Sequence, residues 1–216
     1  MANSLTSMNA SYKDFNTYAD NLNGQGDVNY NNISSAYSKL GELNTSNGWK
    51  GARYDEVVSA FNSMIGDFNA MFKDIQETIP TNLHITGKNI AAFDGQTIDG
   101  RAYTSKSISE ISKSGTTGLT FDEAQVIETR KILRNKFTNA QSAVDEIGNI
   151  ANKLKTAGIW SGESYEKYNT KISTYKKTVH DNLESLITNF SDCMKQAKDD
   201  FDNLQKAIND SLTIGE

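Results

Sequence analysis

The feature that most constrains the fold of this chain is a row of apolar residues from Tyr165 to Ile208, spaced at steps of three or four. Sustained over about six heptads, that spacing is typical of a long amphipathic helix packed along a partner helix. At 1.5 Å per residue the helix would be about 65 Å long. The row consists of Tyr165, Tyr168, Ile172, Tyr175, Val179, Leu183, Leu186, Phe190, Cys193, Ala197, Phe201, Leu204 and Ile208.

A second row with the same spacing predicts a shorter helical arm in the first half of the chain. We expect this arm to end at Pro80, because proline lacks the amide hydrogen and its ring clashes with the preceding turn. The row consists of Tyr54, Val57, Phe61, Met64, Phe68, Met71, Ile75 and Ile79.

Each arm is preceded by a further apolar row, so each is expected to have a helical companion. The later companion should begin near Phe121, since Thr120 and Glu123 have the spacing of a capping box. In the earlier companion, Gly24 and Gly26 predict a kink or break, because each glycine costs a helix interior about 1 kcal/mol. The two rows are Leu133, Phe137, Ala140, Val144, Ile147, Ala151 and Leu154, and Ile33, Ala36, Leu40 and Leu43.

Between Pro80 and Thr120 the helical pattern gives way to Gly, Ser, Thr and Asn. The dipeptides Asp94-Gly95 and Asp99-Gly100 are turn signals, so this stretch is interpreted as a linker. A small β-hairpin within this linker is left open, because Leu83 and Ile85 alternate with polar residues and Ile90 to Phe93 is weakly apolar. The predicted organisation is a first helical hairpin at 1–79, a linker at 80–120 and a second helical hairpin at 121–216.

Both hairpins are expected to turn at the same short motif, Trp49-Lys50-Gly51 and Trp160-Ser161-Gly162. In each copy a tyrosine follows the glycine by three residues, and all equivalent residue numbers, apolar rows included, differ by 111. The chain therefore contains an internal repeat and is predicted to be all-α, with two long antiparallel helical hairpins. The candidate recognition or turn residues are Trp49, Gly51, Tyr54, Trp160, Gly162 and Tyr165.

The motif has two interpretations at this stage. Glycine gives the backbone freedom for a tight reversal, and the Trp ring can cover the open end of the apolar seam with its indole N–H near water. The motif would then only close the hairpin. Alternatively, a Trp at an exposed apex is a typical interface anchor and would be recognised by a partner.

Two Trp-X-Gly turns between heptad rows make the chain resemble the small Trp-X-Gly helical-hairpin proteins of the type VII (ESX or Ess) secretion system of Gram-positive bacteria. The resemblance implies hairpins that pair as an antiparallel four-helix bundle, here two units fused in one chain as a monomeric pseudo-dimer or assembled as a homodimer. It also implies protein partners: a secretion ATPase, another Trp-X-Gly protein or the helices of an exported toxin.

The chain departs from that family in one respect. Export in the family is associated with Tyr, three residues, then Asp or Glu, and none of the nine tyrosines here is followed by an acidic residue at that distance. Two expectations follow from the resemblance and this departure. The protein is secreted by a non-Sec route, alone or with a partner that carries the signal, or it stays in the cytoplasm as a helical chaperone or targeting factor for a toxin.

Charge and hydropathy argue against several other classes. The 216 residues include 22 basic and 27 acidic ones, for a net charge of −5, without the basic cluster that binds nucleic acid. The sequence contains no apolar run of about 18 residues, so no membrane-spanning helix is predicted. The N-terminal sequence does not have the pattern of a signal peptide. A membrane-active helical protein is disfavoured as well. Such proteins have basic polar faces that bind anionic lipid, whereas the polar faces of the predicted helices are acidic or neutral.

The residue types that carry chemistry are not grouped in the sequence. His84 and His180 have no Cys or second His at ligand spacing, and both are expected to face solvent. Cys193 lies in the apolar row and is expected to be a small buried residue. The Asp-Gly pairs lack the ligands of a calcium loop, and no enzyme motif occurs. We therefore expect a non-enzyme without metal or cofactor.

Overall fold

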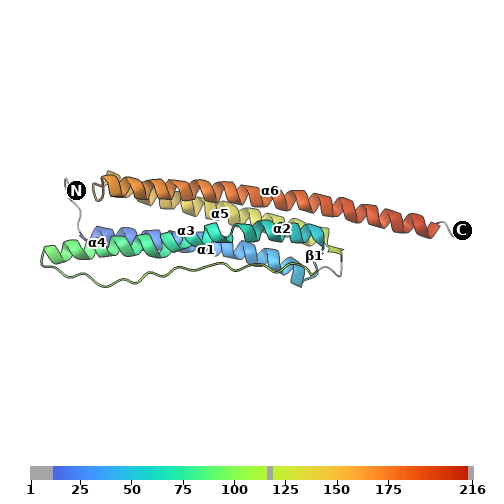
Figure 1. The fold of residues 1–216 in the computed structure, drawn as a ribbon, viewed down its shortest axis with the longest axis horizontal. Coiled ribbons are helices and arrows are strands. Elements are labelled where there is room, and N and C mark those ends of the chain that lie inside the picture. Colours follow the sequence, from blue (N-terminus) through green and yellow to red (C-terminus); the bar gives the residue numbers. More distant parts are fainter. Residues whose placement is uncertain (1–11, 116–118, 214–216) are drawn as a thin grey trace. The chain divides into compact units, whose positions relative to one another are not determined.

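A computed structural model describes residues 12–115 and 119–213 of the chain (Figure 1). The described part is 80% helical with almost no sheet, which confirms the predicted all-α class. In chain order the elements are α1 (Tyr12–Thr45), β1 (Trp49–Lys50), α2 (Ala52–Ser63), α3 (Ile65–Phe72), the π-helical segment η1 (Lys73–Thr78), α4 (Ile79–Phe93), β2 (Thr120–Phe121), α5 (Glu123–Thr156) and α6 (Glu163–Thr213).

The chain divides into two compact units, which are described separately. Unit 1 comprises Met1–Asn32, Gly66–Ile108 and Thr138–His180. Unit 2 comprises Ile33–Ile65, Ser109–Phe137 and Asp181–Glu216. Each unit therefore contains residues from both copies of the sequence repeat.

Unit 1 holds parts of α1, of the α3–η1–α4 run, of α5 and of α6 in contact with one another. Its core includes Phe15, Phe68 and Phe72, all nearly inaccessible to solvent, and the rings of Phe68 and Phe72 stack with centroids 6.5 Å apart. Side-chain hydrogen bonds join the helices, from Asn23 to Gln76, Asn29 to Ala140, Tyr175 to Asp74, and between His180 and Asp145.

Unit 2 also packs residues of the first copy against residues of the second. The rings of Phe61 and Phe137 lie 6.0 Å apart, so α2 contacts α5. The short strands β1 and β2 pair antiparallel, with Trp49 opposite Phe121. The part of the α6 apolar row in this unit is buried from Leu183 to Ala197, whereas its last three members, Phe201, Leu204 and Ile208, are exposed.

The helix that was expected to end at Pro80 instead continues through it as α4 to Phe93. A proline at this position cannot donate to the carbonyl four residues earlier, which belongs to Gln76. That carbonyl accepts a 2.7 Å hydrogen bond from Nδ2 of Asn23 on α1 instead. The predicted end at Pro80 is therefore wrong, and so is the alternative β-hairpin at Leu83 and Ile85, because both residues are helical.

The break expected at Gly24 and Gly26 is also absent, because α1 is continuous from Tyr12 to Thr45. A Cβ atom on Gly26 would lie 2.9 Å from both Gln76 Cγ and Ile75 Cγ2. Gly26 thus permits a close approach of α1 to η1 in unit 1. Gly24 has no such neighbour within 4 Å.

Helix α5 begins at Glu123, two residues later than expected, because Thr120 and Phe121 form β2. Its N-terminus is capped by Asp122, whose Oδ1 accepts the Gln125 amide at 3.0 Å while Gln125 Nε2 donates to Oδ2 at 2.7 Å. These bonds lower the pKa of Asp122. Asp122 is thus the N-cap residue of α5, its own amide donates to Gly48 O, and the expected capping box of Thr120 and Glu123 is wrong.

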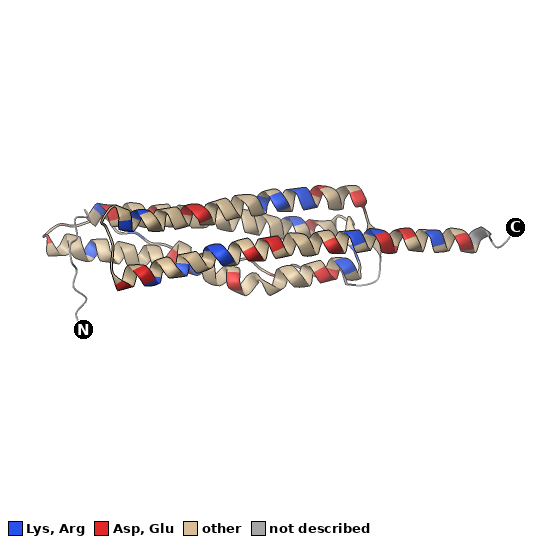
Figure 2. Ribbon diagram, turned by 90° about the horizontal axis from the view of Figure 1, so that it is seen from above, with Lys and Arg blue, Asp and Glu red and all other residues tan. Residues whose placement is uncertain are grey.

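Within the described residues, no helix has the length and apolar character needed to cross a membrane. Acidic and basic residues are interspersed along the helices rather than gathered into a block of one sign (Figure 2).

Candidate functional site

The two Trp-X-Gly turns have the same backbone construction. The first helix of each hairpin ends at a left-handed residue, Asn47 (φ 57°) in one copy and Gly158 (φ 70°) in the other. Equivalent hydrogen bonds close these ends, from Gly48 N to Leu43 O at 2.8 Å and from Ile159 N to Leu154 O at 3.0 Å. This is the usual way to satisfy the last carbonyls of a helix.

The motif glycines begin the second helix of each hairpin. Gly51 has φ 115° and Gly162 has φ 96°, a region that side chains strongly disfavour. Each glycine carbonyl accepts the first helical hydrogen bond, from the amides of Asp55 and Glu166 respectively, both at 3.1 Å. Gly51 and Gly162 are therefore required by the turn geometry itself.

The tyrosine three residues after each glycine fastens the two helices of its hairpin. The hydroxyl of Tyr54 donates to Leu40 O at 3.4 Å, and that of Tyr165 donates to Ala151 O at 3.2 Å. In both copies the acceptor lies 14 residues upstream. Burial raises the pKa of Tyr54 to about 12 and also raises that of Tyr165.

Trp49 is a core residue of unit 2, so the expectation of an indole near water is wrong for this copy. Its side chain is 1% exposed. The ring makes edge contacts with Tyr54, Phe121 and Phe190 at centroid distances of 6.0, 5.9 and 5.4 Å. Phe121 and Phe190 belong to β2 and α6, so residues far away in sequence cover this turn.

Trp160, in unit 1, is partly exposed. Its ring contacts Tyr165 and Tyr168 at 5.9 and 5.2 Å, and Nε1 donates to Ser164 Oγ at 3.0 Å. All three neighbours come from the start of α6. Trp160 therefore matches the expected exposed turn, unlike Trp49.

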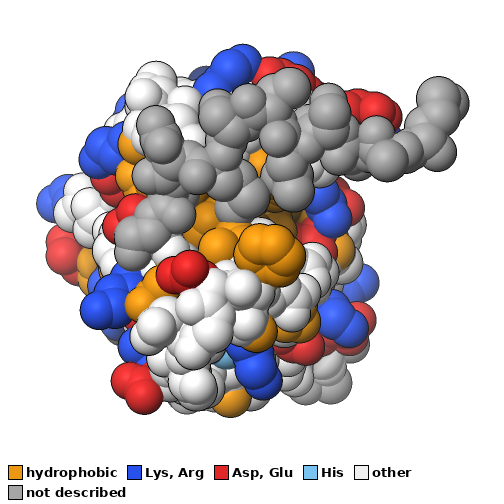
Figure 3. Space-filling model, turned by 90° about the vertical axis from the view of Figure 1, so that its left-hand side faces the viewer, with side chains coloured by type: hydrophobic (Ala, Val, Ile, Leu, Met, Phe, Trp, Pro, Cys, Tyr) orange, Lys and Arg blue, Asp and Glu red, His pale blue; other side chains and the backbone are white. Residues whose placement is uncertain are grey.

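The end of unit 1 where α4 ends and α5 is followed by α6 carries apolar surface. Figure 3 looks onto this end and shows hydrophobic side chains near its centre with charged side chains around the rim. Phe93, the last residue of α4, is 96% exposed. Such a surface is of the kind used in protein contacts.

A second set of residues, which is not among those predicted from the sequence, binds an extended segment of the chain. We call residues 101–108 the strap; they follow α4 without helix or strand, and they lie in unit 1. Asn69 accepts the Ile108 amide at 2.8 Å through Oδ1 and donates to the Ile108 carbonyl at 3.0 Å through Nδ2. One asparagine thus pairs with both backbone groups of one strap residue.

Three further side chains bind the strap backbone. Gln76 Oε1 accepts the Lys106 amide at 2.8 Å, and His84 Nε2 accepts the Arg101 amide at 3.2 Å. The hydroxyl of Tyr30 donates to the Ser107 carbonyl at 3.3 Å. We call Tyr30, Asn69, Gln76 and His84 the strap site.

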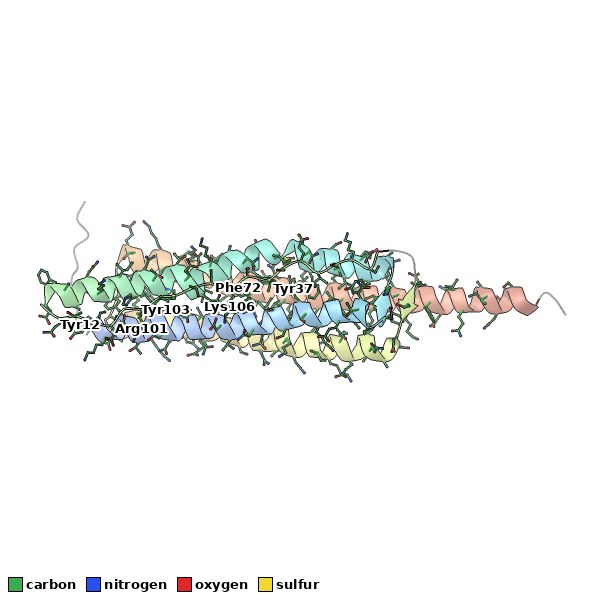
Figure 4. All side chains as sticks on the ribbon, turned by 90° about the horizontal axis from the view of Figure 1, so that it is seen from below. Tyr12, Tyr37, Phe72, Arg101, Tyr103 and Lys106 are labelled. Atoms are coloured by element: carbon green, nitrogen blue, oxygen red, sulfur yellow. The ribbon has the colours of Figure 1, made fainter. Side chains whose placement is uncertain are left out.

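The side chains of the strap add polar contacts to α1 and η1. Tyr103 donates to Asp20 at 2.7 Å, and Arg101 forms an ion pair with the same carboxylate at 3.5 Å. Lys106 Nζ lies 2.9 Å from Asp27. Arg101, Tyr103 and Lys106 follow one another along α1 in Figure 4. Ser105 donates through both its amide and its hydroxyl to Glu77.

Within unit 2, the residues that follow the strap are bound in a similar way. Asn62 accepts the Ile111 amide at 3.0 Å and donates to the Ile111 carbonyl at 2.9 Å. The carboxylate of Asp55 accepts the amide and hydroxyl of Ser114 at 2.7 and 2.8 Å. Ser114 Oγ in turn accepts the amide of Gly51, a residue of the Trp-X-Gly turn, at 3.1 Å.

A sequence signal for these residues did exist. Asn62, Asn69 and Gln76 recur at seven-residue steps, each directly after a member of the apolar row. A polar row at that period marks one helix flank. Which segment it would contact could not be inferred from spacing.

The remaining candidate residues have structural partners. His84 is buried, contrary to expectation, and its Nδ1 lies 2.7 Å from Asn16 Oδ1; burial is the main cause of its lowered pKa. His180 is partly exposed beside Asp145. Cys193 is buried, and its burial raises the thiol pKa to about 11. The described residues contain no cluster of three or more potential metal ligands.

Comparisons with known proteins identify no relative. No family model, curated protein or solved structure matches the chain.

Proposed function

We propose that the chain is a non-enzymatic protein of a type VII secretion pathway, built from two Trp-X-Gly helical hairpins in tandem. In this function it is exported, or it serves as the helical partner of an exported toxin. The observation that carries the proposal is the matched construction of the two turns. Both have a left-handed helix end, a positive-φ glycine and a tyrosine hydroxyl bonded to the carbonyl 14 residues upstream.

Two exposed features fit protein partners such as a secretion ATPase, another Trp-X-Gly protein or toxin helices. Trp160 is partly exposed at its turn, and large aromatic side chains are frequent anchors of interfaces. The end of α6 presents Phe201, Leu204 and Ile208 on one exposed face. An apolar row of this spacing suits an amphipathic partner helix.

A cytosolic chaperone or targeting factor for a toxin is the second candidate. The observation that favours it is the absence of an acidic residue four places after any of the nine tyrosines. Such a protein would use the same exposed surfaces but remain in the cell. Neither candidate requires nucleic acid, a cofactor or membrane insertion.

The test is export and partner capture in the native host with Trp160→Ala and Leu204→Asp. Both sites are at least partly exposed, so each variant should keep a helical circular dichroism spectrum. We expect the wild-type chain in the culture medium and at least a tenfold loss of export or partner capture in Trp160→Ala. Trp160→Phe is the matched control and should retain most of the activity.

The outcomes separate the two candidates. A wild-type chain that stays in the cells and co-purifies with a toxin supports the chaperone function. Folded variants that are exported and bind partners like the wild type would refute a recognition role for Trp160 and the end of α6. A wild-type chain that is unaffected by loss of the secretion ATPase, and that captures no Trp-X-Gly protein or toxin, would refute both candidates.

A further inference from the structure

The strap site binds main chain more than side chains. Asn69 pairs with the amide and carbonyl of Ile108, and Gln76 accepts the Lys106 amide. Tyr30 and His84 contact two further backbone groups of the strap. Because every peptide has these groups, hydrogen bonds to them give affinity for an extended segment with little dependence on its sequence.

The buried members of this site are held in place by the helices of unit 1. Gln76 is 0% exposed, and its Nε2 donates to Asp27 Oδ1 at 2.8 Å, which leaves Oε1 directed at the strap. His84 Nε2 accepts from the strap, so the proton resides on Nδ1, where it is donated to Asn16. Side chains fixed in this way lose little freedom on binding a peptide.

Little of the strap is buried. Of its eight residues only Ile108 is buried. The ion pairs of Arg101 with Asp20 and of Lys106 with Asp27 join side chains that are 37 to 47% exposed, and exposed pairs stabilise little. Ordering an extended segment opposes these small gains. Segments with few buried contacts open locally well below the free energy of global unfolding.

We propose that the strap site is a docking site for an extended basic segment of a partner protein, and that the strap is its replaceable occupant. When the strap lifts, the backbone-binding groups of Asn69, Gln76 and His84 become available to another chain. Asp20, Asp27 and Glu77 line the same site and select for basic and hydroxyl side chains. The preferred partner segment carries two basic residues five positions apart, with an aliphatic residue two positions after the second.

The probe is a labelled synthetic peptide with the sequence of residues 99–110, added to the full chain and followed by fluorescence anisotropy. In one variant the strap is weakened by Arg101→Ala, Tyr103→Ala and Lys106→Ala together, which leaves the strap site intact. We expect this variant to bind the peptide at least tenfold more tightly than the wild-type chain, whose own strap competes. A second variant, with Asn69→Ala added, should lose at least tenfold of that affinity.

Two controls distinguish backbone recognition from charge attraction. A peptide N-methylated at Lys106 and Ile108 lacks the amide hydrogens that Gln76 and Asn69 accept, so it should bind at least tenfold more weakly. A peptide N-methylated at Ser107, whose carbonyl is the bonded group, should bind nearly as well as the unmodified one. Asn32→Ala, at a partly exposed position of α1, should leave affinity unchanged because Asn32 bonds within its own helix.

The proposal is overturned if the weakened variant shows no saturable binding. It is equally overturned if the peptide N-methylated at Lys106 and Ile108 binds as tightly as the unmodified one, or if Asn69→Ala has no effect. Circular dichroism of each variant verifies that the helices are retained. The proposal does not depend on export, so it stands or falls separately from the secretion function.

Discussion

Asn29 and Ala140 occupy equivalent positions of the two sequence copies, and Asn29 Nδ2 donates a 2.7 Å hydrogen bond to the carbonyl oxygen of Ala140. Contacts between equivalent positions are the mark of an isologous, two-fold pairing. Within unit 1, α1 therefore meets α5 as the matching helices of a homodimer would. The Asn29 side chain is fully buried, and its Oδ1 has no hydrogen-bond partner.

Asn29→Asp should lower the free energy of unfolding at pH 7 by about 2 to 4 kcal/mol, because a buried carboxylate would face the Ala140 carbonyl without a donor. Asn32→Asp is the matched control at a partly exposed position of the same helix, where Asn32 Nδ2 donates to Val28 O. It should change stability by less than about 0.5 kcal/mol. Urea unfolding of both variants measures the difference, and equal midpoints would contradict the buried contact.

Gly26→Ala should destabilise the chain by about 1 to 3 kcal/mol, because the new methyl group overlaps Gln76 and Ile75 at 2.9 Å. Gly24→Ala has open space and should stabilise α1 by about 0.5 to 1 kcal/mol through helix propensity. Thermal melts of the two variants should move in opposite directions. A rise in melting temperature for both variants would mean that α1 and η1 move apart easily to accommodate the methyl group on residue 26.

Trp49→Ala and Trp160→Ala should differ in stability although the residues are equivalent in sequence. Removing the buried Trp49 ring leaves a cavity among Tyr54, Phe121 and Phe190 and should cost about 3 to 5 kcal/mol. Removing the partly exposed Trp160 ring should cost about 1 to 2 kcal/mol. Chemical denaturation of the two variants measures both costs, and similar losses would contradict the difference in burial.

The alkaline stability of the chain should depend on Tyr54. Its pKa is raised by burial from its ordinary value near 10 to about 12, so the folded state holds this proton more tightly than the unfolded state. The resulting stability is complete below pH 10 and is lost as the pH rises through 12, by up to roughly 2 to 3 kcal/mol. Between pH 10 and 12, Tyr54→Phe should lose less stability than the wild type. Urea unfolding at a series of pH values measures this difference. Equal losses of unfolding free energy in the wild type and in Tyr54→Phe would refute the linkage.

The full chain should be a monomer at low micromolar concentration. In each unit, residues of the first copy already pack against residues of the second, as Phe61 does against Phe137. Tethering raises the effective concentration of one copy for the other, which favours pairing within one chain. Sedimentation velocity that detects only dimers or larger species would contradict this prediction.

The sequence by itself determined the helical class and the repeat. Apolar residues at steps of three and four can share one face only in a helix, and this local rule located α5, α6 and the later part of α1. The repeat at 111 residues identified both turns. Each turn contains a glycine with positive φ, and this requirement of the local backbone is visible in the sequence as a repeated Trp-X-Gly. These properties depend on neighbours along the chain.

Only the tertiary structure decided how those elements are used. The helix continues past Pro80, which lies in the first turn of α4, and Asn23 on another helix donates to the Gln76 carbonyl to which Pro80 cannot donate. Trp49 is buried because Phe121 and Phe190 cover it, while the equivalent Trp160 contacts only nearby residues of its own copy. Asn69 binds the strap because folding places Ile108 beside it, 39 residues away in sequence. Spacing along the chain indicates which face a residue lies on, but the partner of that face is set by the packing of segments distant in sequence.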